Sequence, residues 1–128
     1  MYHKKHFSIE EANSLLPLID EKLNKIIFLK KSLDEQNYDI YKHSYFGGIT
    51  QNGSGIYPKE FTELITNLNE LTAMGIQIKS LDNGLIDFPH IRENGEEVYL
   101  CYIYGEESIK FWHSIKDGFA GRKPIEDR

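Results

Sequence analysis

The sequence has little of what usually identifies a function. Its 128 residues include one cysteine, one tryptophan and four prolines. A single cysteine excludes an intramolecular disulfide and a zinc site of four thiolates within one chain. No apolar run approaches the roughly 20 residues that span a bilayer, so we expect no membrane partner. The opening segment MYHKKHFSIEE lacks the apolar stretch of a secretory signal, and we expect a cytoplasmic protein.

Positive charge is also scarce. The chain has 15 Lys and Arg against 20 Asp and Glu, a formal net charge of -5. Nonspecific binding of nucleic acids depends on Lys and Arg that neutralise phosphates, so this balance argues against a nucleic-acid partner. The stretch GGITQNGSG lacks the Lys-Ser/Thr that follows the last glycine of a P-loop, which argues against phosphate binding there.

A helical pattern dominates the first half of the chain. Between residues 8 and 36, apolar side chains recur every three or four positions, and Ser8 with Glu11 matches a capping box. The apolar positions are Ala12, Leu16, Ile19, Leu23, Ile26 and Leu33. A second amphipathic helix is predicted over 58–74, after a flexible, glycine-containing loop over 37–57. We expect the two helices to form a long antiparallel hairpin.

The hydrophobic period changes to two after residue 76, which is typical of strands. Two such runs within 76–104 flank Asn94-Gly95, a strong signal for a β-hairpin. If these two residues form the whole loop, Arg92 faces Glu97 and Phe88 faces Cys101. The sequence therefore predicts a single α+β domain, with the helical hairpin packed against a small antiparallel sheet.

The last part of the chain, 106–128, is predicted to form a short helix and a tail. Ile109, Trp112 and Ile115 recur every three residues, which indicates a helix with its apolar side inward. We expect the tail to close the core. Arg122 could then turn back to the sheet and form a forked ion pair with Asp87.

The predicted register tests a possible metal site at Asp87, His90 and Cys101. It places His90 and Cys101 on one face as diagonal neighbours and turns Asp87 to the other face. A zinc or iron site would then need His113 or Glu106 from the C-terminal segment. The alternative is structural, with Cys101 a small buried side chain. Its position in the middle of a strand also argues against a nucleophile paired with His113.

Several stretches resemble a known family: FSIEEANSLLPLI, GLIDFP, EEVYLCYIYGEESIKFWH and DGFAGRKP. They are similar to a prokaryotic family of uncharacterised proteins, domain of unknown function 2203, and the resemblance extends from Phe7 to Pro124. The family pattern usually has Trp at the position of Tyr102. It has a small residue at the position of His90, which argues against His90 as a ligand.

The resemblance implies that six residues form one constellation: Asp87, Cys101, Glu106, Trp112, His113 and Arg122. We expect them to line a pocket between the hairpin and the C-terminal segment that binds a metal ion or a small anionic ligand. Asp87, Glu106, Trp112, His113 and Arg122 would surround the ligand, and Cys101 with His113 would bind a metal such as Zn or Fe.

Two other hypotheses remain. The chain could be a non-enzymatic module that self-associates through its helical hairpin, which would make a homo-oligomer. It could also be a small hydrolase or lyase with His113 as general base and Arg122 holding an anion. The enzyme is the least favoured, because no neighbour in the sequence orients such a base.

Overall fold

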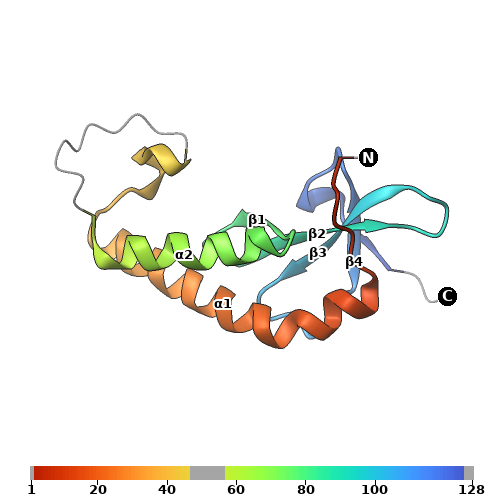
Figure 1. Cartoon of the computed structure of the whole chain (residues 1–128), viewed down its shortest axis with the longest axis horizontal. Helices are drawn as coiled ribbons and strands as arrows, with labels where there is room; N and C mark the ends of the chain where they lie inside the picture. Colours follow the sequence, from red (N-terminus) through yellow and green to blue (C-terminus); the bar gives the residue numbers. More distant parts are fainter. Residues whose placement is uncertain (1, 47–56, 126–128) are drawn as a thin grey trace.

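The computed structural model describes residues 2–46 and 57–125, and these residues build two helices and one antiparallel sheet (Figure 1). The helices are α1 (Ile9–Glu35) and α2 (Lys59–Ala73), and the strands are β1 (Gln77–Ser80), β2 (Leu85–Ile91), β3 (Glu97–Ile103), β4 (Phe111–Ser114) and β5 (Lys123–Pro124). Short 3-10 turns are η1 (Ile40–Lys42), η2 (Ser44–Phe46) and η3 (Phe119–Gly121). The α+β class is confirmed. Residues 47–56 of the predicted loop lie outside the described residues.

Helix α1 forms as its pattern predicts. The Ser8 hydroxyl accepts a hydrogen bond from the Glu11 amide at 2.9 Å and caps the first turn. The apolar seam is buried in the chain's own core, and Lys30, which interrupts that seam, is buried beside Asp34 and Asp82. No helix among residues 2–46 and 57–125 is long and apolar enough to cross a membrane.

The helical layer matches the predicted hairpin only in part. α1 has 27 residues and α2 has 15, so the two helices lie side by side over part of α1 only (Figure 1). Lys22 and Glu70 form an ion pair between them at 3.0 Å. The first turns of α1 instead meet the C-terminal half of the chain, where the Asn13 side chain accepts a hydrogen bond from the Ile109 amide.

The β2–β3 hairpin differs from the prediction by one residue. The Gly95 amide donates to the Arg92 carbonyl and the Arg92 amide donates to the Glu96 carbonyl, both at 2.9 Å, and Gly95 has a φ of 87°. This is a three-residue loop with a glycine in the left-handed region, rather than a two-residue loop. Asp87, not Phe88, therefore faces Cys101. The predicted pairs and the predicted placement of Asp87 are wrong, because a shift of one residue exchanges the two faces of a strand.

The predicted C-terminal helix is also wrong. Residues Phe111–Ser114 form β4 instead, which pairs antiparallel with β3, and β5 pairs with β4 in turn. Successive residues of a strand point to opposite faces, so Trp112 points to one face and His113 to the other, and a spacing of three residues does not gather side chains on one face. Pairing with the free edge of β3 satisfies the backbone and outweighs the local helical pattern. The tail was expected to close the core, but its Phe119 is 47% exposed.

The five strands follow one another in chain order across the sheet, β1-β2-β3-β4-β5. One face packs against the helices and contributes Ile86, Phe88, Leu100 and Tyr102 to the hydrophobic core. We call the opposite side the outer face. It is covered by the N-terminal segment, which bonds to Glu97 and Tyr99, and by the tail, from which Arg122 reaches Cys101.

Candidate metal centre on the outer face of the sheet

Three neighbouring strands bring three metal-binding side chains together. β2 supplies Asp87, β3 supplies Cys101 directly opposite, and β4 supplies His113, which lies opposite Tyr99. One ligand atom from each of the three residues lies within 4.8 Å of the others. Asp87, Cys101 and His113 are 1%, 0% and 3% exposed, so all three are removed from water.

The hydrogen bonds of His113 fix its tautomer. Its Nδ1 lies 2.9 Å from the Ser114 carbonyl oxygen, and its Nε2 lies 3.0 Å from Oδ1 of Asp87. A carbonyl oxygen can only accept, so Nδ1 carries a proton and Nε2 points into the cluster. Asp87 and Nε2 then share one further proton between them.

Burial raises the pKa of Asp87, and the hydrogen bond from His113 opposes that rise. Among nearby cations, the Lys79 ammonium lies 4.0 Å from the second oxygen of Asp87. The carboxylate is thus held between an imidazole and an ammonium, which compensates part of its desolvation. Sequence reasoning missed Lys79, although the alternating pattern of β1 carries it to the strand next to β2.

Cys101 is a neutral thiol in this setting. Burial and the nearby Asp87 raise its pKa to about 11, and the Arg122 guanidinium acts in the opposite direction. At neutral pH the group is therefore protonated, whereas a reactive cysteine is a thiolate that solvent can reach. This agrees with the argument against a nucleophile.

Arg122 does reach the sheet, but its acidic partner is Glu106 rather than Asp87. Its Nη1 lies 3.7 Å from the Sγ of Cys101, and its guanidinium stacks 3.7 Å from the centre of the Phe111 ring. Glu106 is fixed in turn by a hydrogen bond from the Ile103 amide. The predicted Arg122–Asp87 ion pair is wrong because Asp87 is already occupied by His113.

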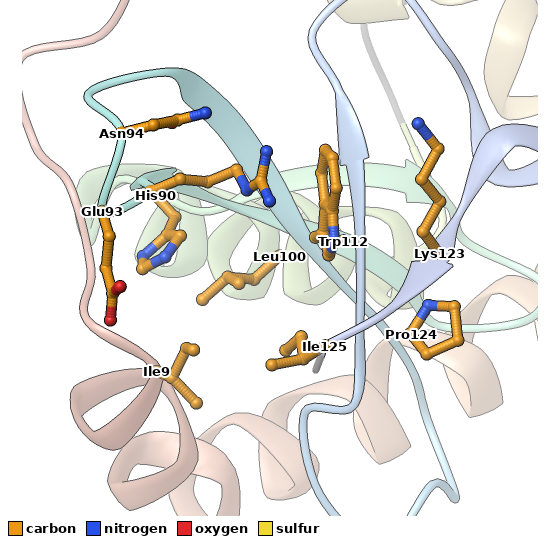
Figure 2. Close-up of a pocket in the computed structure, with 10 residues that line it drawn as sticks. Ile9, His90, Glu93, Asn94, Leu100, Trp112, Lys123, Pro124 and Ile125 are labelled. Carbon is orange, nitrogen blue, oxygen red and sulfur yellow. The ribbon is translucent and has the colours of Figure 1, made fainter. Parts of the chain in front are cut away.

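Trp112 does not join this group. It is adjacent to His113 in β4, so it points to the helix-facing side, where Lys123 and Arg92 approach its ring (Figure 2). His90 lies on that side too, and its Nδ1 donates to the Phe7 carbonyl at 2.7 Å. The predicted constellation therefore divides. Asp87, Cys101, His113, Arg122 and Glu106 share the outer face, and Trp112 belongs to the other.

A small cavity of about 140 Å³ adjoins the three metal-binding side chains. Ile115, Asp117 and Phe119 line it from the tail, and Lys79 and Leu85 line it from the first two strands. The volume is enough for a few water molecules or one small anion. The cluster thus has one side open to a space that a further ligand could occupy.

The comparisons with known proteins agree with the resemblance in the sequence. A family model described as an uncharacterized conserved protein, DUF2203, matches residues 5–125, so the chain belongs to this family. No curated protein and no solved structure matches the chain. The fold and the cluster define a small α+β domain with a buried Asp-Cys-His group.

Proposed function

We propose that this protein binds one transition-metal ion of the zinc type at Asp87, Cys101 and His113. The observation that carries the proposal is the convergence of a thiol, an imidazole and a carboxyl group within 4.8 Å. A tetrahedral zinc site, with bonds of about 2.0–2.3 Å, holds its ligand atoms roughly 3.3–3.8 Å apart. Nε2 of His113 and Oδ1 of Asp87, 3.0 Å apart, are already near that spacing, and no pair of ligand atoms is more than 4.8 Å apart, so the Cys101 sulfur would need to approach by no more than about 1 Å.

The mixture of ligand atoms favours zinc or iron over magnesium and calcium. Thiolate and imidazole suit zinc and iron, whereas Mg²⁺ and Ca²⁺ prefer oxygen ligands alone. Three protein ligands with an open fourth position are typical of zinc sites that bind a further molecule. The 140 Å³ cavity beside the cluster would provide that position.

The surroundings of the cluster support the same proposal. Histidine ligands usually donate their second N–H to a carbonyl or carboxylate, and Ser114 accepts that bond from His113. Arg122 beside the sulfur would stabilise a thiolate, and Lys79 beside the cavity would favour an anionic fourth ligand. The residues thus fit a metal with a small anion bound to it.

Zinc binding to protein purified without an affinity tag and stripped with a chelator tests the proposal. We expect one zinc per chain by elemental analysis after dialysis, and a thiolate-to-cobalt charge-transfer band when Co²⁺ replaces zinc. Because burial raises the pKa of Cys101 to about 11, zinc must displace the thiol proton, and the affinity should increase with pH.

Matched substitutions separate the ligands from their surroundings. Cys101→Ser and His113→Gln should each weaken zinc binding at least about 100-fold, since even the loss of an outer partner costs about 10–100-fold. His6→Gln makes the same change as His113→Gln away from the cluster and should leave the affinity unaltered. A folded protein that takes up no zinc, or variants that bind it as tightly as the wild type, would show that the three residues form only an internal brace.

A further inference from the structure

A second hollow lies on the helix-facing side of the sheet. It is a groove of about 960 Å³, within the size range of small-molecule sites. Its lining comes from the start of α1, from β2 and β3 with the loop between them, from β4, and from β5 with Ile125 (Figure 2). Because β4 contributes Trp112 here and His113 to the outer face, this groove is distinct from the proposed metal centre.

The floor of the groove is apolar. Ile9, Leu100 and Ile125 converge there, and Figure 2 shows their side chains below Trp112. Leu100 is buried, whereas Ile9, Ile125 and Trp112 remain partly exposed. Apolar surface that is left open inside a hollow favours a ligand with an apolar body, since its burial removes both surfaces from water.

Two cationic side chains line the walls of the groove. The Arg92 guanidinium lies 4.2 Å and the Lys123 ammonium 5.0 Å from the centre of the Trp112 ring. Among residues 2–46 and 57–125, Trp112 is the only ring that two different cationic side chains approach. Two like charges on one ring repel each other, so the arrangement gains from an anion placed between them.

The charges are only partly balanced. Arg92 pairs with the exposed Glu96 at 3.0 Å, and Glu93 adds one negative charge to the lining. Within the described part of the chain, no carboxylate lies within ion-pair distance of Lys123. The two cations and two carboxylates cancel formally, but the Lys123 ammonium beside Trp112 has no carboxylate of the described residues within ion-pair distance.

We propose that this groove binds a small organic anion with an apolar body, of the type of a medium-chain carboxylate. The carboxylate would lie between Lys123 and Arg92 at the edge of Trp112, and the hydrocarbon would cover Ile9, Leu100 and Ile125. The ligand needs both its carboxylate and its hydrocarbon. An inorganic anion would leave the apolar floor exposed, and a neutral chain would leave Lys123 without a counter-charge among the described residues.

Trp112 is the only tryptophan, so its fluorescence reports on the groove directly. Decanoate, added as monomer to the full chain, should change this fluorescence saturably, with a Kd below about 1 mM and one site per chain. Decanol has the same chain without the charge and should bind at least about tenfold more weakly. Inorganic phosphate should have no effect.

Charge-removing substitutions complete the test. Lys123→Gln and Arg92→Gln should each weaken decanoate binding at least about fivefold. Lys116→Gln removes the same charge from an exposed position outside the groove and should not change the affinity. Equal binding of decanol, an equal effect of Lys116→Gln, or a fluorescence change that only anionic vesicles produce would each overturn the proposal. Loss of zinc binding in Cys101→Ser, with decanoate binding intact, would keep the two sites separate.

Discussion

The two faces of the sheet are both buried, but by different means. The helix-facing side carries Ile86, Phe88 and Leu100, none more than 1% exposed, against the long apolar seams of α1 and α2. The outer face is equally dry at Asp87 and Cys101, but only short irregular segments cover it. Burial by itself therefore does not distinguish the helix-facing side from the outer face, which holds the candidate metal centre.

The difference lies in what the buried groups require. Apolar side chains need only close neighbours, and regular helices supply them over a large area. Buried polar groups need specific partners, and each must come from a defined position. Among the described residues, no buried side-chain nitrogen or oxygen lacks a hydrogen-bond partner, so the outer face meets this demand. Burial on this face is therefore tolerated only because these polar groups are hydrogen-bonded.

The helix-facing side should respond most strongly to substitution. Phe88 is fully buried and meets the Phe7 ring edge to face at 5.3 Å. Phe88→Ala should lower the free energy of unfolding by about 3–5 kcal/mol, because it leaves a large cavity. Cys101→Ala, at the same depth on the outer face, removes one atom and should cost less than about 2 kcal/mol. Urea denaturation with chelator present measures both, and equal losses would refute this ranking of the faces.

The next effect tests the polar demand of the outer face. Asp87→Ala should lower the free energy of unfolding of the metal-free protein by about 1–3 kcal/mol, because it leaves His113 buried without its partner. Asp87→Asn should cost less, since an amide can donate to Nε2 of His113. Denaturation in chelator compares the two variants. A loss that is the same for Ala and Asn would mean that the hydrogen bond contributes little.

The sequence predicts the first face well and the second face poorly. A helix seam such as Leu16, Leu23 and Ile26 repeats over many residues, so an error at one position does not change the prediction. The outer face depends on the register of one hairpin. The loop was expected to contain two residues and contains three, and this moved Asp87 away from Cys101 in the prediction. Asp87, Cys101 and His113 each stood out in the sequence as candidate site residues, but their grouping could not be derived from the residues alone.

Strand β4 shows a second limit. Trp112 and His113 stood out in the sequence, yet a segment of four strand residues carries too few positions to separate a period of two from a period of three. What decides the outcome is the open edge of β3, which is available for pairing once β2 and β3 form their hairpin. Because successive residues of a strand point to opposite faces, the strand conformation of β4 by itself places Trp112 and His113 on opposite sides of the sheet.

The hairpin loop that sets the register can be weakened directly. Gly95 has a φ of 87° and open space around it, so Gly95→Ala is opposed only by the backbone conformation. We expect a loss of about 1 kcal/mol in the free energy of unfolding. Gly118 also has open space but a φ of -98°, and Gly118→Ala should be nearly neutral. Similar losses at the two glycines, measured by urea denaturation, would argue against a left-handed residue in the loop.

The smallest effect concerns the cover of the outer face. Glu97 accepts hydrogen bonds from the Tyr2 and His3 amides and from His6, at 2.7, 3.1 and 2.7 Å. Burial alone would raise its pKa, but these bonds prevail and lower the pKa from 4.5 to about 2. Its hold on the N-terminal segment is thus complete above about pH 4.5 and is lost as the pH falls towards 2.

Nuclear magnetic resonance of the amides of residues 2–6 measures this hold without unfolding the domain. In the wild type, we expect these residues to become mobile as the pH falls from about 4.5 to 2. Glu97→Gln cannot titrate and should leave them mobile at every pH, whereas Glu96→Gln changes an exposed carboxylate bonded to Arg92 and should behave like the wild type. If Glu97→Gln keeps the segment ordered at neutral pH, contacts such as His3 with Tyr99 hold it instead. The cover of the outer face would then depend little on the charge of Glu97, whereas the helix-facing side depends throughout on apolar contact.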